Sequence, residues 1–415
     1  MALTNWAGTV AFTPGAALAP RTIEEAQAMV AAAPRIRALG TGHSFNALAD
    51  STALISLRGI DLPFDLDEEA RTVTVPGAAP YGAVAAYLQE RGWALHNLGS
   101  LPHISVAGAC ATGTHGSGDG NGVLPTAVRG IERIGPDGTL SWVRADDPDF
   151  AGSVVALGAL GVVTRLTLTI EPSYDITQQI YTGLAWDRFL DDFDDIMGAA
   201  YSVSVLGRWR EPALSTLWIK ARDDDAEPAA RRFGAELQGP RVGALADGGS
   251  PDDNLTPIGS RGPWATRLAH FRFDRAPSAA GDEIQSEYFV PRAQGAAALR
   301  AVRALADRID PVLHVSEFRT LAGDDLWLSG GEGGPRLGIH FTWRKLPDEV
   351  GRVLPEIEDA LAPFRPRAHW GKLYSDGFDQ TAAYGRVPDF TALMSRVDPD
   401  GVFRSPYLDR ALGLA

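Results

Sequence analysis

The stretch GSLPHISVAGACATGTHGSGDGNG, residues 99–122, restricts the possible folds of this chain more than any other segment. It contains seven glycines in 24 residues and leaves only a short segment, SVAGACA (105–111), that can form a helix. Each glycine inside an ordered element costs about 0.5–1 kcal/mol relative to alanine. We therefore expect the backbone of this stretch to pass very close to another group.

The short helix expected at 105–111 would begin after Ser105, a residue type suited to the N-cap position. Free N–H groups at the start of a helix attract anions, so a pyrophosphate is the expected ligand. The stretch is not a P-loop, because no GKS or GKT closes it, and it does not match the G-x-G-x-x-G fingerprint. A loop whose glycines serve only tight turns remains the alternative.

Two further segments carry small residues at positions that suggest close backbone approach. GTGHSFN (40–46) places His43 between glycine and serine, and GALGVVTRLTL (158–168) puts glycines before a long strand. Taken alone, a single histidine in a loop is more often a structural or solvent-facing residue than a functional one. The second glycine-rich stretch makes a functional role for His43 the better interpretation.

The length of 415 residues favours two domains over a single core. Alternating or β-branched runs predict strands in both halves, at 35–39, 52–57, 71–75, 162–170, 202–207, 214–220, 312–320 and 336–343. Helices are expected at 80–92, 292–308 and 347–362, with a hairpin turn at 135–140 and a long loop at 238–264. The sequence thus predicts an α+β fold divided into 1–172, 173–383 and 384–415, the last packing back on the first.

Charge and composition exclude several classes of protein. A net charge of −14 disfavours nucleic acid and anionic membrane surfaces as partners, because both require a basic face. No run of 18 apolar residues and no leader-like N-terminus is found, so we expect a cytoplasmic protein. The single cysteine, Cys110, excludes internal disulfides and is too few for a structural zinc site.

Two strands of the second half carry polar side chains on one face. In LHVSEFRT (313–320), alternation places Leu313, Val315, Glu317 and Arg319 together. In RLGIHFTW (336–343), His340 and Thr342 share a polar face, opposite an apolar face that should pack on a core. The alternative for Glu317 and Arg319 is a surface ion pair that contributes little to stability. For His340 and Thr342 the alternative is a sheet face exposed to solvent.

The segments GTGHSFN, GSLPHISVAGACATGTHGSG and LGALGVVTRLTL, in this order, resemble the FAD-binding domain of vanillyl-alcohol-oxidase type flavoproteins. The resemblance continues through SEFRT, IHFTW and HWGKLY, so it covers nearly the whole chain, and it is strongest to the alditol oxidases. It implies a two-domain flavoprotein, with an FAD-binding domain of the PCMH type and an α+β cap over the flavin ring.

The same resemblance implies that FAD is bound covalently through His43. A neutral imidazole is a nucleophile near pH 7, which suits such a link. The other residues implied to hold FAD are Gly40, Thr41, Gly42, Ser44, Phe45, Asn46, Ser100, Ser105, Gly108, Thr112, Gly113, Thr114, His115, Gly158, Gly161, Val163 and His369. Cys110, a possible second flavin link, is instead expected to be a small buried hydrophobic residue.

The resemblance further implies oxidation of the terminal primary alcohol of an alditol such as xylitol, sorbitol or glycerol to the aldose, with dioxygen reduced to hydrogen peroxide. The implied substrate-binding residues are Ser100, Glu317, Arg319, Thr342 and Lys372, and the implied catalytic residues are Lys372, His340, Glu317 and Arg319. Lys372 is favoured as the base because burial beside Arg319 would lower its pKa, with His340 assisting. Gly99 would leave room for dioxygen.

Two other functions stay open on the same scaffold. An aldonolactone or small 2-hydroxy-acid oxidoreductase would use Arg319 and Lys372 to bind a carboxylate or ring carbonyl, and a non-catalytic flavin-binding protein would show no turnover. We expect no metal, because His96, His103 and His115 lack adjacent carboxylates at ligand spacing; His103 and His115 should brace or contact the cofactor. The expected partners are a polyol and dioxygen, and the expected state is a monomer.

Overall fold

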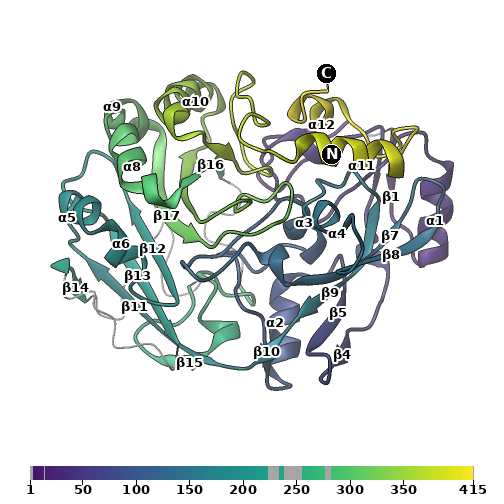
Figure 1. Ribbon diagram of the computed structural model, residues 1–415, viewed down its shortest axis with the longest axis horizontal. Coiled ribbons are helices and arrows are strands. Elements are labelled where there is room, and N and C mark those ends of the chain that lie inside the picture. Colours follow the sequence, from purple (N-terminus) through teal and green to yellow (C-terminus); the bar gives the residue numbers. More distant parts are fainter. Residues whose placement is uncertain (1–2, 14, 223–232, 238–254, 276–281, 415) are drawn as a thin grey trace.

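Two sheet systems lie side by side in the computed structural model, which describes residues 3–13, 15–222, 233–237, 255–275 and 282–414 (Figure 1). The first half of the chain forms three small sheets. Their strands are β1 (Ala16–Leu18), β3 (Ala53–Ile55) and β2 (Arg37–Ala38) in one; β10 (Glu171–Pro172) and β6 (Trp93–Ala94) in another; and β4 (Asp65–Asp67), β5 (Thr72–Pro76), β9 (Val162–Thr169), β7 (Val128–Ile134) and β8 (Leu140–Arg144) in the third.

Strand β9 shows why the first half folds as the sequence predicts. Its residues VVTRLTLT alternate between buried and half-buried positions, as a strand with one covered face requires. The helices of this half are α1 (Ile23–Ala32), α2 (Tyr81–Gln89), α3 (Val106–Ala111) and α4 (Phe150–Val154). Helix α2 begins directly after Pro80, and Gly92, with φ at +76°, lets the chain leave after it, as expected.

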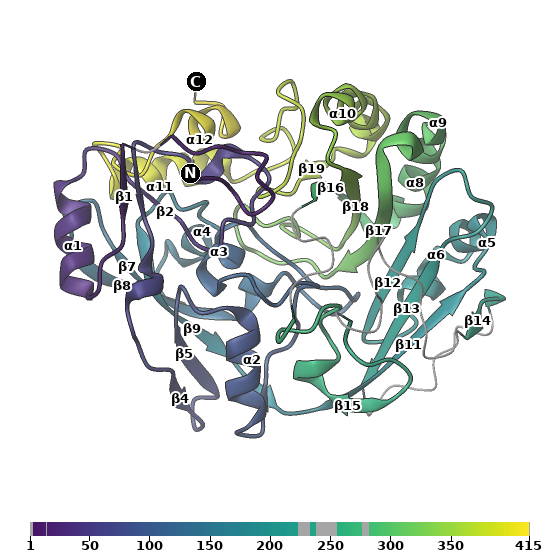
Figure 2. The same ribbon diagram turned by 180° about the vertical axis from the view of Figure 1, so that it is seen from behind.

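The second half is built on one nine-stranded sheet. Its path is β14 (Glu236–Leu237), β11 (Asp175–Thr182), β13 (Thr216–Arg222), β12 (Ser202–Gly207), β17 (Leu313–Leu321), β18 (Arg336–Arg344), β16 (Glu283–Pro291) and β19 (Arg367–Ala368), with β15 (Arg261–Pro263) added beside β11. Five helices cover its outer face: α5 (Trp186–Asp191), α6 (Phe193–Met197), α8 (Gly295–Arg303), α9 (Ala306–Ile309) and α10 (Pro347–Leu361) (Figure 2).

The outer face of this sheet is apolar and packs beneath the helices. Phe318, Phe341 and Trp343 are fully buried in one cluster with side chains of α5, α8 and α10. The sequence prediction that Leu337, Ile339, Phe341 and Trp343 form the packed face of β18 is therefore confirmed. The opposite face of the sheet, which carries His340, turns toward the first half of the molecule.

One face assignment in β17 was wrong. A register shift between Leu313 and Val315 forms a bulge against β18, so Leu313 joins the apolar cluster instead of sharing a face with Glu317. A bulge adds one unpaired residue and reverses the alternation on one side of it. Val315, Glu317 and Arg319 keep the common face that the alternation predicts.

The remaining described segments are the part of the expected loop that forms β15 and the two C-terminal helices. Part of the loop expected at 238–264 lies outside the described residues, and 261–263 form strand β15 instead of loop. Helices α11 (Val387–Val397) and α12 (Pro406–Ala411) bury Phe390 and Leu408 in the core cluster of the first half. The boundaries at 172 and 383 stay a prediction. Within the described residues, no helix is both long and apolar enough to cross a bilayer.

Candidate functional site

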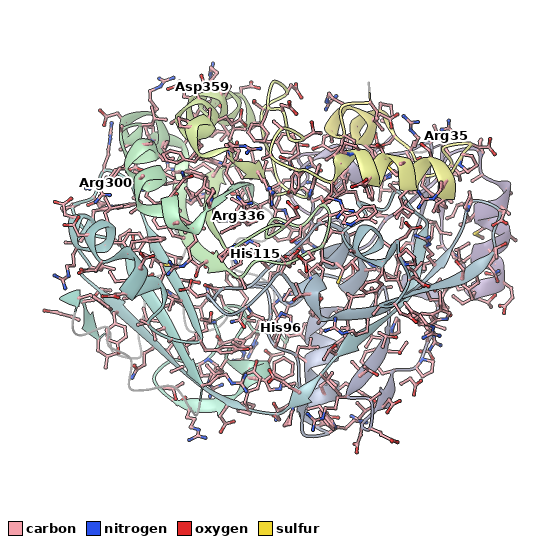
Figure 3. The ribbon with its side chains drawn as sticks, in the orientation of Figure 1. Arg35, His96, His115, Arg300, Arg336 and Asp359 are labelled. Carbon is pink, nitrogen blue, oxygen red and sulfur yellow. The ribbon has the colours of Figure 1, made fainter. Side chains whose placement is uncertain are left out.

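A cavity of about 350 Å³ lies between the two halves, and both contribute to its walls. The first half supplies loops 37–45, 99–115 and 157–163, and the second supplies the polar face of β16, β17 and β18. Figure 3 shows His115, one of the lining residues, near the middle of the molecule, whereas Arg300 and Asp359 lie at its edge. The site is thus internal and composite.

His43 lines this cavity with both ring nitrogens unbonded. Its ring stacks on Trp6 with centroids 5.2 Å apart, and neither Nδ1 nor Nε2 has a hydrogen-bond partner in the protein. Burial, with smaller contributions from His103 and Arg58, lowers the pKa of His43 to about 4. The imidazole is therefore neutral near pH 7 and has a nitrogen lone pair available.

Two glycines in the wall beside His43 let the backbone pack closely around the Ser105 side chain. A Cβ at Gly40 would lie 2.7 Å from Ser105 Oγ, and one at Gly108 would lie 2.8 Å from the same atom. Ser105 precedes α3 but its side chain makes no capping bond, and its buried Oγ has no partner. An unpaired buried hydroxyl and unpaired imidazole are costly unless a ligand satisfies them, so this wall fits a large polar cofactor such as FAD.

Glu287 of β16 is the centre of the opposite wall. It is fully buried, and it accepts hydrogen bonds from Lys372 Nζ at 2.7 Å and from an Arg319 terminal nitrogen at 3.0 Å. His115 Nε2 lies 3.1 Å from the same carboxylate, and His340 Nδ1 lies 3.5 Å away. One carboxylate thus gathers side chains from four separate segments of the chain.

The groups around Glu287 keep its carboxyl ionised. Burial opposes its ionisation, but Lys372, His115 and Arg319 outweigh burial and hold the pKa of the carboxyl well below its ordinary value. Burial also lowers the pKa of Lys372, in spite of the opposing effect of Glu287. The direction agrees with the sequence prediction for Lys372, and burial is its main cause.

His340 is a neutral member of this group. Burial and the neighbouring Lys372 lower its pKa to about 4. Lys372 Nζ donates to its Nδ1 at 2.6 Å, and its Nε2 lies 3.1 Å from Thr342 Oγ1. Because Nδ1 accepts, the ring proton must sit on Nε2, where it can be donated to Thr342.

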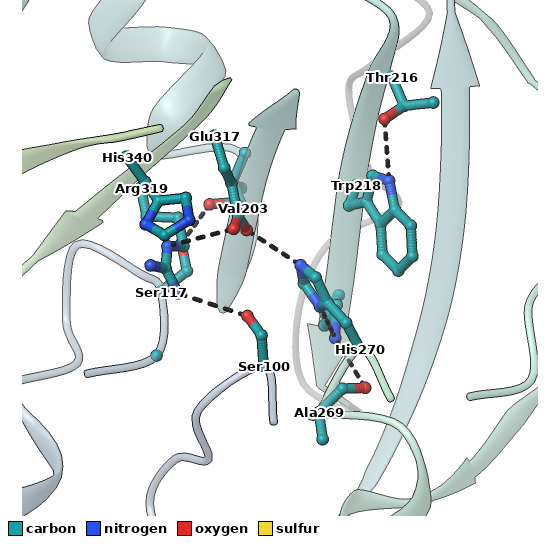
Figure 4. A network of polar contacts seen from close by, with 12 residues as sticks. Ser100, Ser117, Val203, Thr216, Trp218, Ala269, His270, Glu317, Arg319 and His340 are labelled. Atoms are coloured by element: carbon teal, nitrogen blue, oxygen red, sulfur yellow. Dashed lines mark hydrogen bonds and ion pairs between the residues drawn. The ribbon is translucent and has the colours of Figure 1, made fainter. Parts of the chain in front are cut away.

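Glu317 and Arg319 form a second charged pair beside the first (Figure 4). Arg319 Nε lies 3.7 Å from Glu317 Oε2, and an Arg319 terminal nitrogen donates to Ser100 Oγ at 3.4 Å. His270 donates to Glu317 Oε1 at 3.0 Å. The expectation that Glu317 and Arg319 share a face holds, and they are buried in the cavity rather than exposed.

The cavity brings together nearly all the residues singled out from the sequence. Among the lining residues are Gly40, Thr41, Gly42, His43, Ser44, Phe45, Ser100, Ser105, Gly108, Thr112, Thr114, His115, Gly158, Gly161, Val163, Glu317, Arg319, His340, Thr342, His369 and Lys372. Asn46 and Gly113 are not among them. Asn46 instead donates to the carbonyls of Trp370 and Lys372, both at 2.8 Å, and so fastens the His43 loop to the lysine segment.

Sequence reasoning missed several residues of the second half. Glu287 and Gln285 line the cavity from β16, and His270 lines it from the segment beside Ser100. A signal existed for Glu287, since an acid inside the strand run EIQSEYFV is unusual unless paired. His270 had none, because neighbouring residues show no periodicity that would place it.

Cys110 and two histidines lie away from the lining. The thiol of Cys110 is buried in the core cluster beside the Tyr81 hydroxyl, and burial raises its pKa to about 12. It is therefore the small buried hydrophobic residue that was expected. His103 contacts the Arg275 carbonyl at 2.9 Å, and His96 is buried outside the cavity.

Comparison with known proteins agrees with this arrangement. Residues 14–144 match the family described as FAD binding domain, and residues 281–411 match the family described as D-arabinono-1,4-lactone oxidase. An alditol oxidase from Streptomyces sp. (strain IKD472 / FERM P-14339) is 41% identical to this chain over 98% of both. An L-gulono-1,4-lactone dehydrogenase from Mycobacterium tuberculosis is 28% identical over 99% of this chain and 98% of its own.

The fold also has a solved counterpart. Cholesterol oxidase from B. sterolicum superimposes with a TM-score of 0.80 at 15% identity, covering 99% of this chain and 96% of the other. This likeness confirms the mixed α+β, two-domain flavoprotein fold, with a cap beside the FAD-binding part. The identity to the Streptomyces enzyme, with the match to the FAD binding domain, establishes that the chain belongs to the alditol oxidase family of FAD-dependent flavoprotein oxidases.

Proposed function

We propose that this enzyme oxidises the terminal primary alcohol of an alditol such as xylitol or sorbitol to the aldose, and that dioxygen becomes hydrogen peroxide. The observation that carries the proposal is the set Glu287, His340, Glu317 and Arg319, all buried, with the partly buried Lys372, which faces the cavity wall that fits FAD. Bound FAD supplies the two-electron acceptor, which dioxygen then reoxidises.

Lys372 is the proposed acceptor of the substrate's hydroxyl proton. As a neutral amine it has two N–H donors, which its contacts with Glu287 and His340 occupy, and one lone pair remains for the hydroxyl. When the proton moves to Nζ, the O–H bond breaks and an ammonium forms. Glu287 then pairs with that charge at 2.7 Å.

The other side chains are proposed to hold the hydroxyls of the polyol. Each hydroxyl both donates and accepts, so recognition needs donors and acceptors side by side. Arg319 donates, Glu317 accepts, and Ser100 and Thr342 can do either. A hydroxyl that misses its partner leaves a buried polar group unpaired at a cost of about 1–3 kcal/mol, which gives selectivity.

His43 is proposed to carry the covalent bond to the flavin. Its neutral ring, unbonded nitrogens and stacking on Trp6 support this role. The absorbance spectrum after acid precipitation tests it, since the pellet should be yellow in the wild type. In a His43→Ala variant the colour should move to the supernatant, and a colourless wild-type protein after incubation with FAD would contradict the cofactor itself.

A peroxide assay with alditols tests the reaction. Xylitol and sorbitol should give hydrogen peroxide in proportion to the aldose formed. The second candidate is an aldonolactone oxidoreductase, which the match of residues 281–411 to a lactone oxidase family favours. Faster turnover of aldono-1,4-lactones than of xylitol would support that candidate and contradict the first.

A further inference from the structure

Lys220 of β13 is a buried lysine that the proposed reaction does not use. It is 1% exposed, and its described partners are three backbone carbonyls and one ring nitrogen. Nζ lies within hydrogen-bond distance of four acceptors that share its N–H groups: the carbonyls of Arg267 at 3.0 Å, Ala269 at 3.3 Å and Leu268, and His270 Nδ1 at 3.1 Å. The lysine therefore fixes both the turn that carries His270 and the ring of His270 itself.

The contact with Lys220 settles the tautomer of His270. Burial and Lys220 lower the pKa of His270 to about 4, so its ring is neutral. Burial lowers the pKa of Lys220 to about 7; its ammonium can only donate to Nδ1, and the ionised Glu317 can only accept from Nε2. Nδ1 is then the acceptor, and the ring proton sits on Nε2, 3.0 Å from Glu317 Oε1.

Other contacts hold the His270 ring in place. It stacks on Trp218 with centroids 4.4 Å apart and planes 28° from parallel. Figure 4 draws both side chains beside Glu317 and Ser100. The backbone N–H groups of His270 and Phe271 both donate to the Ser100 carbonyl at 3.1 Å. The segment thus connects Ser100 in the first half with Glu317 in the second, at the edge of the cavity.

Glu317 is the end of this chain of contacts. Its two carboxylate oxygens meet His270 Nε2 and Arg319 Nε, and its side chain lines the cavity. Burial raises the pKa of Glu317, but Arg319 and His270 outweigh burial and keep the carboxyl ionised. An ionised carboxylate has no proton to give, so toward a ligand it can only accept.

We propose that Lys220 and His270 are positioning residues that hold Glu317 as a hydrogen-bond acceptor, so that the site selects donating hydroxyls over the carbonyl of a lactone. The inference rests on the proposed function and explains how the same site distinguishes polyols from lactones. A hydroxyl that lies at Glu317 satisfies the carboxylate, whereas a lactone carbonyl or ring oxygen at the same position presents only lone pairs to it. Without this relay from Lys220 through His270 to Glu317, only the 3.7 Å contact from Arg319 Nε would hold the carboxylate in place.

Three variants of the holoenzyme test the relay. His270→Phe keeps a ring on Trp218 but removes both nitrogens, Lys220→Met removes the donor to Nδ1, and His270→Gln keeps an N–H near Nε2. Thr216→Val is the matched control on the same strand, because it deletes the part-buried bond from Trp218 Nε1 to Thr216 Oγ1 at 3.0 Å and no hydrogen bond of Lys220, His270 or Glu317. Thermal unfolding and flavin content confirm that each variant is folded and loaded.

The expected result is a change in KM rather than in kcat. KM for xylitol should rise roughly 10-fold or more in His270→Phe and Lys220→Met, because Glu317 loses its partner, while kcat changes less than about 3-fold. The preference for xylitol over an aldono-1,4-lactone should fall by a similar factor. His270→Gln should recover most of it, and Thr216→Val should match the wild type.

A direct measurement of xylitol binding tests the relay without relying on turnover. Calorimetric titration of xylitol into the anaerobically reduced holoenzyme should show the same loss of affinity in His270→Phe and Lys220→Met. Folded variants with unchanged KM, affinity and preference would overturn the relay, as would a loss in kcat alone. Wild-type enzyme that turns over only lactones would instead overturn the proposed function, so the two failures are distinct.

Discussion

At the scale of single residues, Glu287 decides how the charges of the site are balanced. It is fully buried and contacts Lys372, Arg319 and His115, so its carboxylate compensates the positive charge of Lys372 and Arg319. Breaking one partner of a buried pair typically costs about 3–5 kcal/mol, because the other charge is left without compensation. The residue is therefore expected to affect both stability and the ionisation of Lys372.

The Glu287→Gln variant tests this role. The amide keeps the shape but removes the charge that favours the ammonium of Lys372, so the pKa of Lys372 should fall further. Since the proposed base must be unprotonated to accept a proton, the acidic limb of the kcat/KM profile should move to lower pH. Stability should fall by about 3 kcal/mol in chemical denaturation. A limb that moves to higher pH would contradict the assignment.

Gly99 offers a second test at this scale. It lines the cavity next to Ser100, and a Cβ built there would meet Thr114 Cγ2 at 3.6 Å, which is ordinary contact. Gly99→Ala should therefore fold without strain, whereas Gly99→Val adds bulk in the space proposed for dioxygen. Stopped-flow measurements should show that Gly99→Val slows reoxidation by oxygen at least about 10-fold more than reduction by xylitol. Equal slowing of both half-reactions would refute this role.

At the scale of elements, β18 separates stability from catalysis on its two faces. His340 points into the cavity, while Phe341 is fully buried under the helices and stacks on Trp343 with centroids 4.8 Å apart. Phe341→Ala should lower the free energy of unfolding by about 3–5 kcal/mol and leave KM within about 2-fold. His340→Ala should show the reverse pattern.

Denaturant unfolding and steady-state kinetics on both variants measure this separation. A Phe341→Ala enzyme with intact stability would mean that the apolar face is not the support of the sheet. An active His340→Ala enzyme would mean that the bond from Lys372 to Nδ1 does not matter for the reaction.

Elements also set the limit of what the sequence could predict. Period-2 alternation in β18 correctly separated the residues that pack under the helices from those that face the cavity, because successive side chains of a strand point to opposite faces. The bulge after Leu313 was missed, since an extra residue in a strand leaves no mark on composition. Glu287 and His270 were missed because their function depends on which strands become neighbours, and that is decided by tertiary packing.

At the scale of the whole molecule, buried histidines make stability depend on pH. Burial is the main cause that lowers the pKa of His96, His270 and His340 to about 4 each. In the unfolded chain these rings titrate near 6.5, so between pH 6.5 and 4 the unfolded state binds protons that the folded state does not. Stability therefore falls as pH decreases through this window and is fully present above it.

The expected size follows from the number of groups. Each such histidine contributes about 1.4 kcal/mol per pH unit inside the window, so these three alone give about 4 kcal/mol per pH unit, and His43, His115 and His369, whose pKa values burial also lowers, add to it. Denaturant unfolding at pH 6.5, 6.0, 5.5 and 5.0 measures the slope. Because His96 lies outside the cavity, a His96→Asn variant should reduce the slope by about 1.4 kcal/mol per pH unit without changing ligand binding. A wild-type slope near zero between pH 6.5 and 5 would show that these rings take up protons in the folded state, which would also remove the neutral His340 and His270 on which the proposed proton transfer and relay depend.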